Sequence, residues 1–221
     1  MIKKILSVFI VCFTVNCFSQ SYMNGVVNSA PLKIFTKAKT PDEFTGSPYY
    51  DDSFLPAKID DGEHTMDAFV RYNAVEDVVE VKIKRNTDEI NVLPKLKKIR
   101  YVLNDYKIFI DEFVNEDGES INGYMLDYYT DKGIRFLARP EPDVIEAQPA
   151  RTGYDKDKPA HLDVEMVYYI QKDGARLKEV RLKEKDFKKL FSDKPKMIPY
   201  FKDNKIKDGK DVVRMLEYYS S

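Results

Sequence analysis

The sequence predicts a mainly β protein of the α+β class, with an antiparallel meander sheet or partly open barrel and short C-terminal helices. Short runs of alternating apolar and polar residues recur from Leu55 onward, as in half-buried strands. Asp-Gly pairs separate several of these runs and can adopt the positive φ angles of tight hairpins. After Leu182 the spacing of apolar residues changes to that of a helix.

The expected strands are rich in β-branched and aromatic residues. In 78–84, valine and isoleucine alternate with glutamate and lysine, so one face is apolar and the other charged. Strands are expected at 67–73, 77–84, 98–103, 106–113, 123–129, 133–139, 162–170 and 175–182. Turns are expected at Asp61-Gly62, Asn104-Asp105, Asp117-Gly118, 131–133 and Asp173-Gly174. The proline-rich stretch 139–161 is expected to be a long loop.

The C-terminal segment 183–221 is expected to form short helices that pack on the sheet. Two apolar stripes predict them, one at Phe187, Leu190 and Phe191 and the other at Val212, Val213, Leu216 and Tyr219. Asp208 is a suitable N-cap for the last helix. The middle helix is expected to begin near Ile198, because Pro199 would break a helix begun at Lys194.

The N-terminus resembles a signal peptide, which predicts export to the periplasm, the outer-membrane surface or the medium. Two lysines precede an apolar run at 5–15, and small residues flank Phe18 in the manner of a cleavage site after Ser19. On this interpretation 1–19 is removed together with Cys12 and Cys17, the only cysteines. Lipidation of Cys17 is the alternative, but Asn16 stands where a lipoprotein signal has a small residue.

The mature chain is expected to consist of an extended lead-in or linker at 20–45, a β domain at 46–182 and the helical segment. The full sequence holds 36 basic and 37 acidic residues, and this near-neutral mixture gives no driving force for binding nucleic acid or an anionic membrane. No stretch after the signal is apolar enough to predict a transmembrane helix.

No familiar catalytic motif predicts an enzyme, and no cofactor is indicated. The sequence has no Gly-x-Ser-x-Gly elbow, no phosphate-binding glycine loop and no His-Glu-x-x-His pair. The cluster at 60–64, which includes His64, could hold a divalent ion, but a solvated hairpin tip is the favoured interpretation, so no metal site is expected. His161 is expected at the surface. A hydrolase would need paired carboxylates, for which Asp51, Asp52, Asp155 and Asp157 are candidates.

Several phrases of the sequence resemble a family of uncharacterised, exported, β-rich proteins of flavobacterium-like bacteria. They are "GSPYYDDSFLPAKI" at 46–59, "RYNAVEDVVEVKI" at 71–83 and "YYIQKDGARLKEVRLKEKDFKKLFSDK" at 168–194. The resemblance spans most of the mature chain and implies an envelope or secreted protein with a β-rich body and a helical C-terminus. It implies no activity and no catalytic residues.

Tyrosine doublets are the most unusual feature of the chain. They are Tyr49-Tyr50, Tyr128-Tyr129, Tyr168-Tyr169 and Tyr218-Tyr219, and they hold about half of the 15 tyrosines. In a strand, a doublet puts one ring on each face, so one ring can pack in the core while its neighbour offers a surface for a sugar, a peptide or another subunit. The alternative is that both rings cover the edges of a small core without tryptophan. The candidate binding residues are therefore Tyr49, Tyr50, Tyr128, Tyr129, Tyr168 and Tyr169.

Three functions remain open on the sequence alone. The first is a non-catalytic envelope module that binds or scaffolds a partner, either an envelope protein, a sugar or a lipid. The second is a carrier that holds a hydrophobic ligand in a half-barrel, which predicts a roomy apolar cavity. The third is a carboxylate-dependent hydrolase, which predicts two acids in a cleft with unlike environments.

Cleavage after Ser19 should give a mature chain that begins at Gln20 and has no thiol. We expect the intact mass of the exported protein to match this chain. Reducing agent should leave its thermal midpoint unchanged, because no disulfide is available to lose. A mass that shows a diacylated Cys17 would contradict this prediction.

Overall fold

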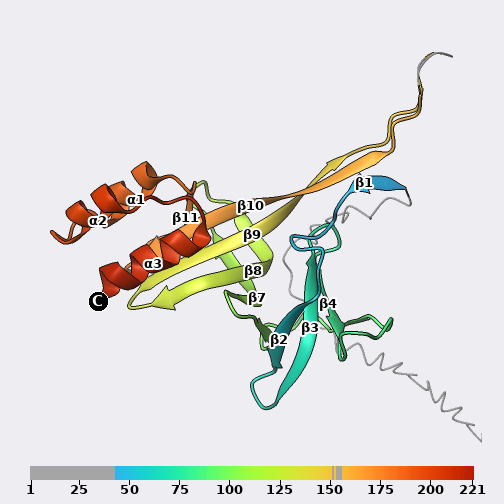
Figure 1. Cartoon of the computed structure of the whole chain (residues 1–221), viewed down its shortest axis with the longest axis horizontal. Helices are drawn as coiled ribbons and strands as arrows, with labels where there is room; N and C mark the ends of the chain where they lie inside the picture. The colour runs from blue at the N-terminus through green and yellow to red at the C-terminus, as the bar shows by residue number, and fades with distance from the viewer. Residues whose placement is uncertain (1–42, 151, 153–155) are drawn as a thin grey trace, which may run out of the picture. The chain divides into compact units, whose positions relative to one another are not determined.

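The computed structural model describes residues 43–150, 152 and 156–221, which all belong to one compact unit. Within these residues, eleven strands form a single sheet and three helices follow it (Figure 1). The expected signal peptide and most of the expected lead-in lie outside the described residues. The first strand begins at Phe44, inside the segment expected as lead-in.

The sheet is a meander with two connections between strands that are not neighbours in it, and the mainly β prediction is confirmed. The strands are β1 Phe44–Gly46, β2 Leu55–Asp60, β3 Thr65–Asn73, β4 Val78–Lys82, β5 Asn91–Val92, β6 Arg100–Val102, β7 Lys107–Val114, β8 Ser120–Asp131, β9 Ile134–Ile145, β10 Ala160–Lys172 and β11 Lys178–Val180. Their order in the sheet is β1-β10-β9-β8-β7-β6-β2-β3-β4-β5, and β11 also pairs with β10. Among the described strands, β1 and β10 form the one parallel pair, and an isolated parallel bridge joins Asn115 to Leu177.

The sheet curls into an open half-barrel, and two tyrosines show how tightly. Tyr72 on β3 and Tyr124 on β8 belong to strands four steps apart in the sheet order. In a flat sheet such strands would lie about 19 Å apart. The two rings instead meet edge to face with centroids 5.8 Å apart. The inner faces of the two halves of the sheet are therefore in direct contact.

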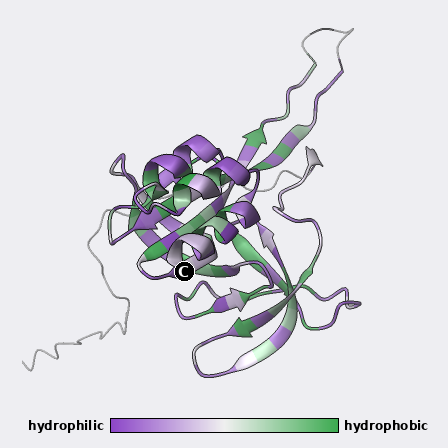
Figure 2. Cartoon of the chain, turned by 60° about the vertical axis from the view of Figure 1, so that its left-hand side comes forward, coloured by the Kyte–Doolittle hydropathy of each residue, from purple (hydrophilic) through white to green (hydrophobic). Residues whose placement is uncertain are grey.

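Side chains fill the inner face of the curled sheet. Tyr101 of β6 is completely buried there, its ring lies 6.3 Å from that of Tyr124, and its hydroxyl has no hydrogen-bond partner within the described part of the chain. The connection that follows β5 packs Leu93 and Ile99 against the same core. Figure 2 shows both hydrophobic and hydrophilic residues along the strands. The central strands are buried on their other face as well, where Met125, Leu137 and Tyr169 form a smaller core.

Tight turns join most neighbouring strands, as the Asp-Gly pairs predict. Gly62 and Gly118 have φ angles of 91° and 83°, in the left-handed region that favours glycine. At the β10–β11 connection, Asp173 and Gly174 both have positive φ, which is the pattern of a type I′ hairpin. The β8–β9 turn at 131–133 is also confirmed.

The expected long loop at 139–161 is partly wrong, because β9 continues to Ile145 and β10 begins at Ala160. Together they form a long hairpin arm that extends beyond β8 (Figure 1). Pro140 and Pro142 lie within β9. In a strand, the backbone nitrogens of residues two apart point toward the same edge. Both prolines, which have no N–H to donate, therefore fit β9 if that edge is not paired with another strand. Among the described strands, only β10 pairs with this part of β9.

The C-terminal helices pack on the sheet through a core of their own. They are α1 Glu184–Phe191, α2 Met197–Asp203 and α3 Gly209–Ser220. Phe187, Phe191 and Leu216 are completely buried, in a cluster that includes Phe136 of β9. Asp208 is the N-cap of α3, as predicted, and its carboxylate accepts a hydrogen bond from the Asp211 amide.

The middle helix begins one residue earlier than expected, and this changes which side chain it buries. Met197 is completely buried, whereas Ile198 is 68% exposed. Pro199 lies in the first turn of α2, where its missing N–H costs no helical hydrogen bond.

Truncating a helix core residue should destabilise the whole domain. Phe187→Ala should lower the free energy of unfolding by about 3–5 kcal/mol, because it removes a large buried ring from the contact with Phe136. Ile198→Ala should change it by less than about 0.5 kcal/mol, because that side chain faces water. Denaturant titrations of both variants would measure this difference. Equal stabilities would show that the helices are not part of the cooperative unit.

Candidate functional site

Four tyrosines from four segments of the chain meet at one end of the inner face. Tyr50 precedes β2, Tyr106 follows the β6–β7 turn, Tyr128 lies on β8 and Tyr168 on β10. We call them the tyrosine cluster. Ring centroids are 6.4 Å apart for Tyr50 and Tyr106, 5.3 Å for Tyr106 and Tyr128, and 6.5 Å for Tyr128 and Tyr168.

A buried phenylalanine and the start of α3 support the cluster from behind. The ring of Phe136 stacks on Tyr168 at 5.7 Å and lies 5.8 Å from that of Tyr128. A Cβ on Gly209, in the first turn of α3, would lie 3.7 Å from the Tyr128 ring. The cluster therefore lies where the sheet and the helices meet.

Two hydroxyl groups of the cluster meet. The Tyr50 and Tyr128 hydroxyl oxygens are 3.4 Å apart, and Tyr50 is 37% exposed, whereas the other three rings are partly buried. Burial, followed by the Tyr50 phenol, holds the pKa of Tyr128 well above its usual range. Burial raises the pKa of Tyr168 to about 12 and also raises that of Tyr106. These phenols stay protonated at neutral pH, so each can donate as well as accept a hydrogen bond.

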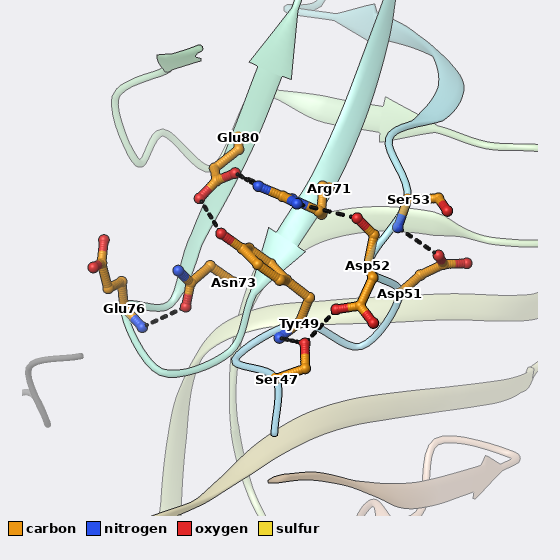
Figure 3. A network of polar contacts seen from close by, with 9 residues as sticks. All are labelled: Ser47, Tyr49, Asp51, Asp52, Ser53, Arg71, Asn73, Glu76 and Glu80. Carbon is orange, nitrogen blue, oxygen red and sulfur yellow. Dashed lines mark hydrogen bonds and ion pairs between the residues drawn. The ribbon is translucent and has the colours of Figure 1, made fainter. Parts of the chain in front are cut away.

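The segment 47–54 carries Tyr50 into the cluster and is held by Arg71 of β3 (Figure 3). The Arg71 guanidinium forms an ion pair with Glu80 at 2.7 Å and donates to the Asp52 carbonyl oxygen at 3.0 Å. It also lies 3.6 Å from the centre of the Tyr49 ring and 4.4 Å from that of Phe54. Arg71 is thus enclosed between two rings and a carboxylate, which fixes the segment on the outer face of the sheet.

Further hydrogen bonds fix the shape of this segment. The Tyr49 hydroxyl donates to Glu80 at 3.2 Å, and the Tyr49 amide donates to the Ser47 hydroxyl at 3.1 Å. The Ala74 amide donates to the Pro48 carbonyl oxygen at 2.8 Å. With Tyr49 tied to the outer face, the next residue, Tyr50, reaches the tyrosine cluster on the inner face.

A narrow cleft lies beside Tyr50 and Tyr106, with a volume of about 10 Å³. Leu103, Ile108 and Leu126 form much of its apolar wall. This volume accommodates about one water molecule and is far too small for an acyl chain. A larger groove of about 320 Å³ runs along β2 and β3, but it is open to solvent. Neither is the enclosed apolar cavity that the carrier hypothesis predicts.

The tyrosine doublets meet their expected geometry in part. Tyr168 faces the cluster while Tyr169 packs on the opposite face against Phe113, with centroids 5.4 Å apart, as alternation predicts. On β8 a β-bulge between Asp127 and Tyr129 breaks the alternation. Both rings of this doublet consequently pack against the helix core, and the Tyr129 hydroxyl donates to Ser220 at 2.8 Å.

Of the six candidate binding residues, the cluster contains Tyr50, Tyr128 and Tyr168. Tyr49, Tyr129 and Tyr169 have the separate contacts described above. Tyr106 was not predicted, because it is not part of a doublet, and neither was Arg71, whose role depends on contacts distant in sequence. The only local signal for Tyr106 was its place directly after the Asn104-Asp105 turn.

The acidic and histidine candidates mainly stabilise turns. The Asp61 carboxylate accepts hydrogen bonds from the His64 and Glu63 amides, which lower its pKa. His161 is exposed, with Nδ1 at 3.0 Å from the Thr45 hydroxyl. Asp157 accepts a hydrogen bond from the Ala150 amide.

The remaining hydrolase candidates show a similar pattern. The Asp51 carboxylate accepts a hydrogen bond from the Ser53 amide and that of Asp52 accepts one from the Ser47 hydroxyl (Figure 3). Asp155 lies outside the described residues. Within residues 43–150, 152 and 156–221, no group of three or more His, Cys, Asp or Glu side chains is arranged to hold a metal ion.

The fold and the site define a half-barrel sheet with a tyrosine-rich rim and C-terminal helices. The chain matches no protein-family model, no curated protein and no solved structure. Among the described helices, none has the length and apolar character needed to cross a membrane.

Removing the Arg71 side chain should loosen the segment that carries Tyr50. Arg71→Ala should lower the free energy of unfolding by about 2 kcal/mol, because Glu80 loses its charged partner at a site with little exposure. Amides in 47–54 should then exchange faster with deuterated solvent. Lys97→Ala is the matched control, because its ion pair with Glu112 is largely exposed and should contribute little. Equal effects of the two variants would contradict the anchoring role.

Proposed function

We propose that this protein is an exported, non-catalytic module that binds a partner through the tyrosine cluster. The observation that carries the proposal is the convergence of rings from four segments at one partly exposed rim, with the hydroxyls of Tyr50 and Tyr128 3.4 Å apart. A tyrosine that only fills the core would not be expected to expose its hydroxyl at this rim.

The chemistry of the cluster suits a ligand with both apolar faces and hydroxyl groups, and a sugar is the favoured class. Tyrosine offers a large ring for little loss of side-chain entropy, and its hydroxyl can donate or accept. The contact between Tyr50 and Tyr128 is long for a hydrogen bond between hydroxyls, so exchanging it for a ligand hydroxyl would cost little. The Asp51 carboxylate, next to Tyr50, adds an acceptor at the same rim.

The cluster is also well ordered for binding, which reduces the entropy lost on association. Phe136 fixes the rings of Tyr128 and Tyr168, and Arg71 holds the segment that carries Tyr50. A ligand would therefore meet rings that are already in place.

Two observations weigh against the other functions. The cleft beside Tyr50 is too small for an acyl chain, which weighs against a carrier. The described candidate carboxylates are engaged in turn hydrogen bonds. A hydrolase would instead need two acids directed into one cleft.

Site-specific photo-crosslinking in the native envelope tests the proposal. A photoreactive phenylalanine analogue at Tyr50 should capture a partner that mass spectrometry can identify, while the same analogue at Tyr218 should not. Tyr218 is a matched control because it is a tyrosine of similar exposure outside the cluster. Identical adducts from both positions, or none from Tyr50, would count against binding at the cluster.

The affinity of the captured partner gives a quantitative check. Tyr50→Ala should weaken binding by about thirtyfold, as for an aromatic hot spot worth about 2 kcal/mol, and Tyr50→Phe should weaken it less because the ring is kept. Because the chain has no tryptophan, tyrosine fluorescence can report the titration directly.

A further inference from the structure

A second surface, distinct from the tyrosine cluster, combines positive charge with exposed aliphatic side chains. It is the segment 82–100, which runs from the end of β4 through β5 to the start of β6 and which we call the basic loop (Figure 1). It contains only two acidic residues, Asp88 and Glu89. Its seven basic residues are Lys82, Lys84, Arg85, Lys95, Lys97, Lys98 and Arg100.

Acidic neighbours balance part of this positive charge. Lys95 pairs with Asp77, and Lys97 pairs with Glu112 at 3.2 Å. The Lys82 ammonium lies 4.7 Å from the centre of the Phe54 ring. The other four cations form no direct ion pair among the described residues, although Arg100 lies opposite Asp60 in the β2–β6 register and the charge of Lys98 helps to lower the pKa of Asp61. They are Lys84, Arg85, Lys98 and Arg100, and all four are exposed.

Large aliphatic side chains lie between these cations and face solvent. Ile83, Ile90, Val92 and Leu96 are each between 45% and 52% exposed. The neighbouring residues Leu93 and Ile99 point into the core, so the loop is anchored while its other side chains project outward. Exposed apolar residues concentrated in one short segment are a sign of an interaction surface.

We propose that the basic loop binds the surface of an anionic phospholipid bilayer. Lysine and arginine near such a surface are attracted to the lipid headgroups, and aliphatic side chains that enter the headgroup region bury apolar area. The long cationic side chains can extend toward phosphates while Ile83 and Leu96 enter the apolar layer. This goes beyond the proposed function and shares no residue with it.

The composition of the loop favours lipid over other anionic partners. Protein interfaces are enriched in aromatic residues and arginine and depleted in lysine, whereas this loop has no aromatic residue and five lysines. Proteins that bind single-stranded nucleic acid use aromatic rings to stack bases, and contacts to phosphates alone would leave the four aliphatic side chains in water. A bilayer accommodates both kinds of side chain.

Vesicle co-sedimentation of the full protein tests the inference. The probes are phosphatidylcholine vesicles with and without phosphatidylglycerol, at low and high salt. Binding should require phosphatidylglycerol and fall with salt. Lys84→Glu/Arg85→Glu should weaken it at least about 25-fold, since each cation near the surface contributes about fivefold. Ile83→Ser/Leu96→Ser should also weaken it.

A matched pair on another surface serves as control. Ile198→Ser/Lys202→Glu changes an exposed isoleucine and an exposed lysine on α2 and should leave binding unchanged. All changed side chains are exposed, so the thermal midpoints of the three variants should match that of the parent. Matching midpoints would show that a loss of binding is not caused by unfolding.

Three outcomes would overturn the inference. They are equal binding to both kinds of vesicle, an equal loss in the control variant, and binding that the Ile83→Ser/Leu96→Ser change leaves intact. If the protein ignored anionic vesicles and the basic loop instead crosslinked to an envelope protein, the loop would be a protein interface.

Discussion

The contact between Tyr72 and Tyr124 is the constraint on which the rest of the structure depends. It joins strands that are four steps apart in the sheet and so sets the curl of the half-barrel. The Asp77 carboxylate reinforces it, because it accepts a hydrogen bond from the Tyr72 hydroxyl at 2.8 Å and one from the Tyr124 amide at 3.5 Å. Lys95, in the connection between β5 and β6, forms a salt bridge with Asp77 and so holds this connection at the same point. With these groups in place, side chains fill the inner face, and the tyrosine cluster lies at its partly exposed rim.

Most of the fold could be predicted from the sequence because its signals are local. Alternation in runs such as 78–84 depends only on neighbours, and so does the preference of Asp173-Gly174 for positive φ. The arm at 139–145 could not be predicted in this way. Proline normally excludes a strand, and the exception holds only where the nitrogen faces a free edge, which depends on the pairing of the whole sheet. The start of α2 was predicted to within one residue, because a proline is compatible with the first turn of a helix but not with its interior.

The candidate site was predictable only in part, because a tyrosine doublet places one ring on each face of the sheet wherever the strand is regular. This reasoning succeeded for Tyr168 because β10 is regular there. It failed for Tyr129 because a bulge lets two consecutive rings face the helices, and a bulge leaves no clear mark in the sequence. Tyr106 and Arg71 contribute through contacts far away in the chain. Such contacts become visible only when the curl of the sheet is known.

The near-neutral net charge of the chain conceals local differences in charge. On the hairpin arm, Asp143 lies opposite Asp163 and Glu141 lies opposite Glu165 in the antiparallel register. Like charges in such positions destabilise a strand pair, so the arm must gain its stability from its other face, where Val164 and Met166 pack against the inner core. The basic loop concentrates the opposite charge in a separate segment.

Because screening limits the reach of exposed charges to about 10 Å, a partner responds to the local charge and not to the sum over the chain. The total charge alone therefore does not decide which partners each surface suits. The basic loop and the acidic face of the hairpin arm, formed by Glu141, Asp143, Asp163 and Glu165, differ in electrostatic potential. The charges close to each surface determine which partners it attracts.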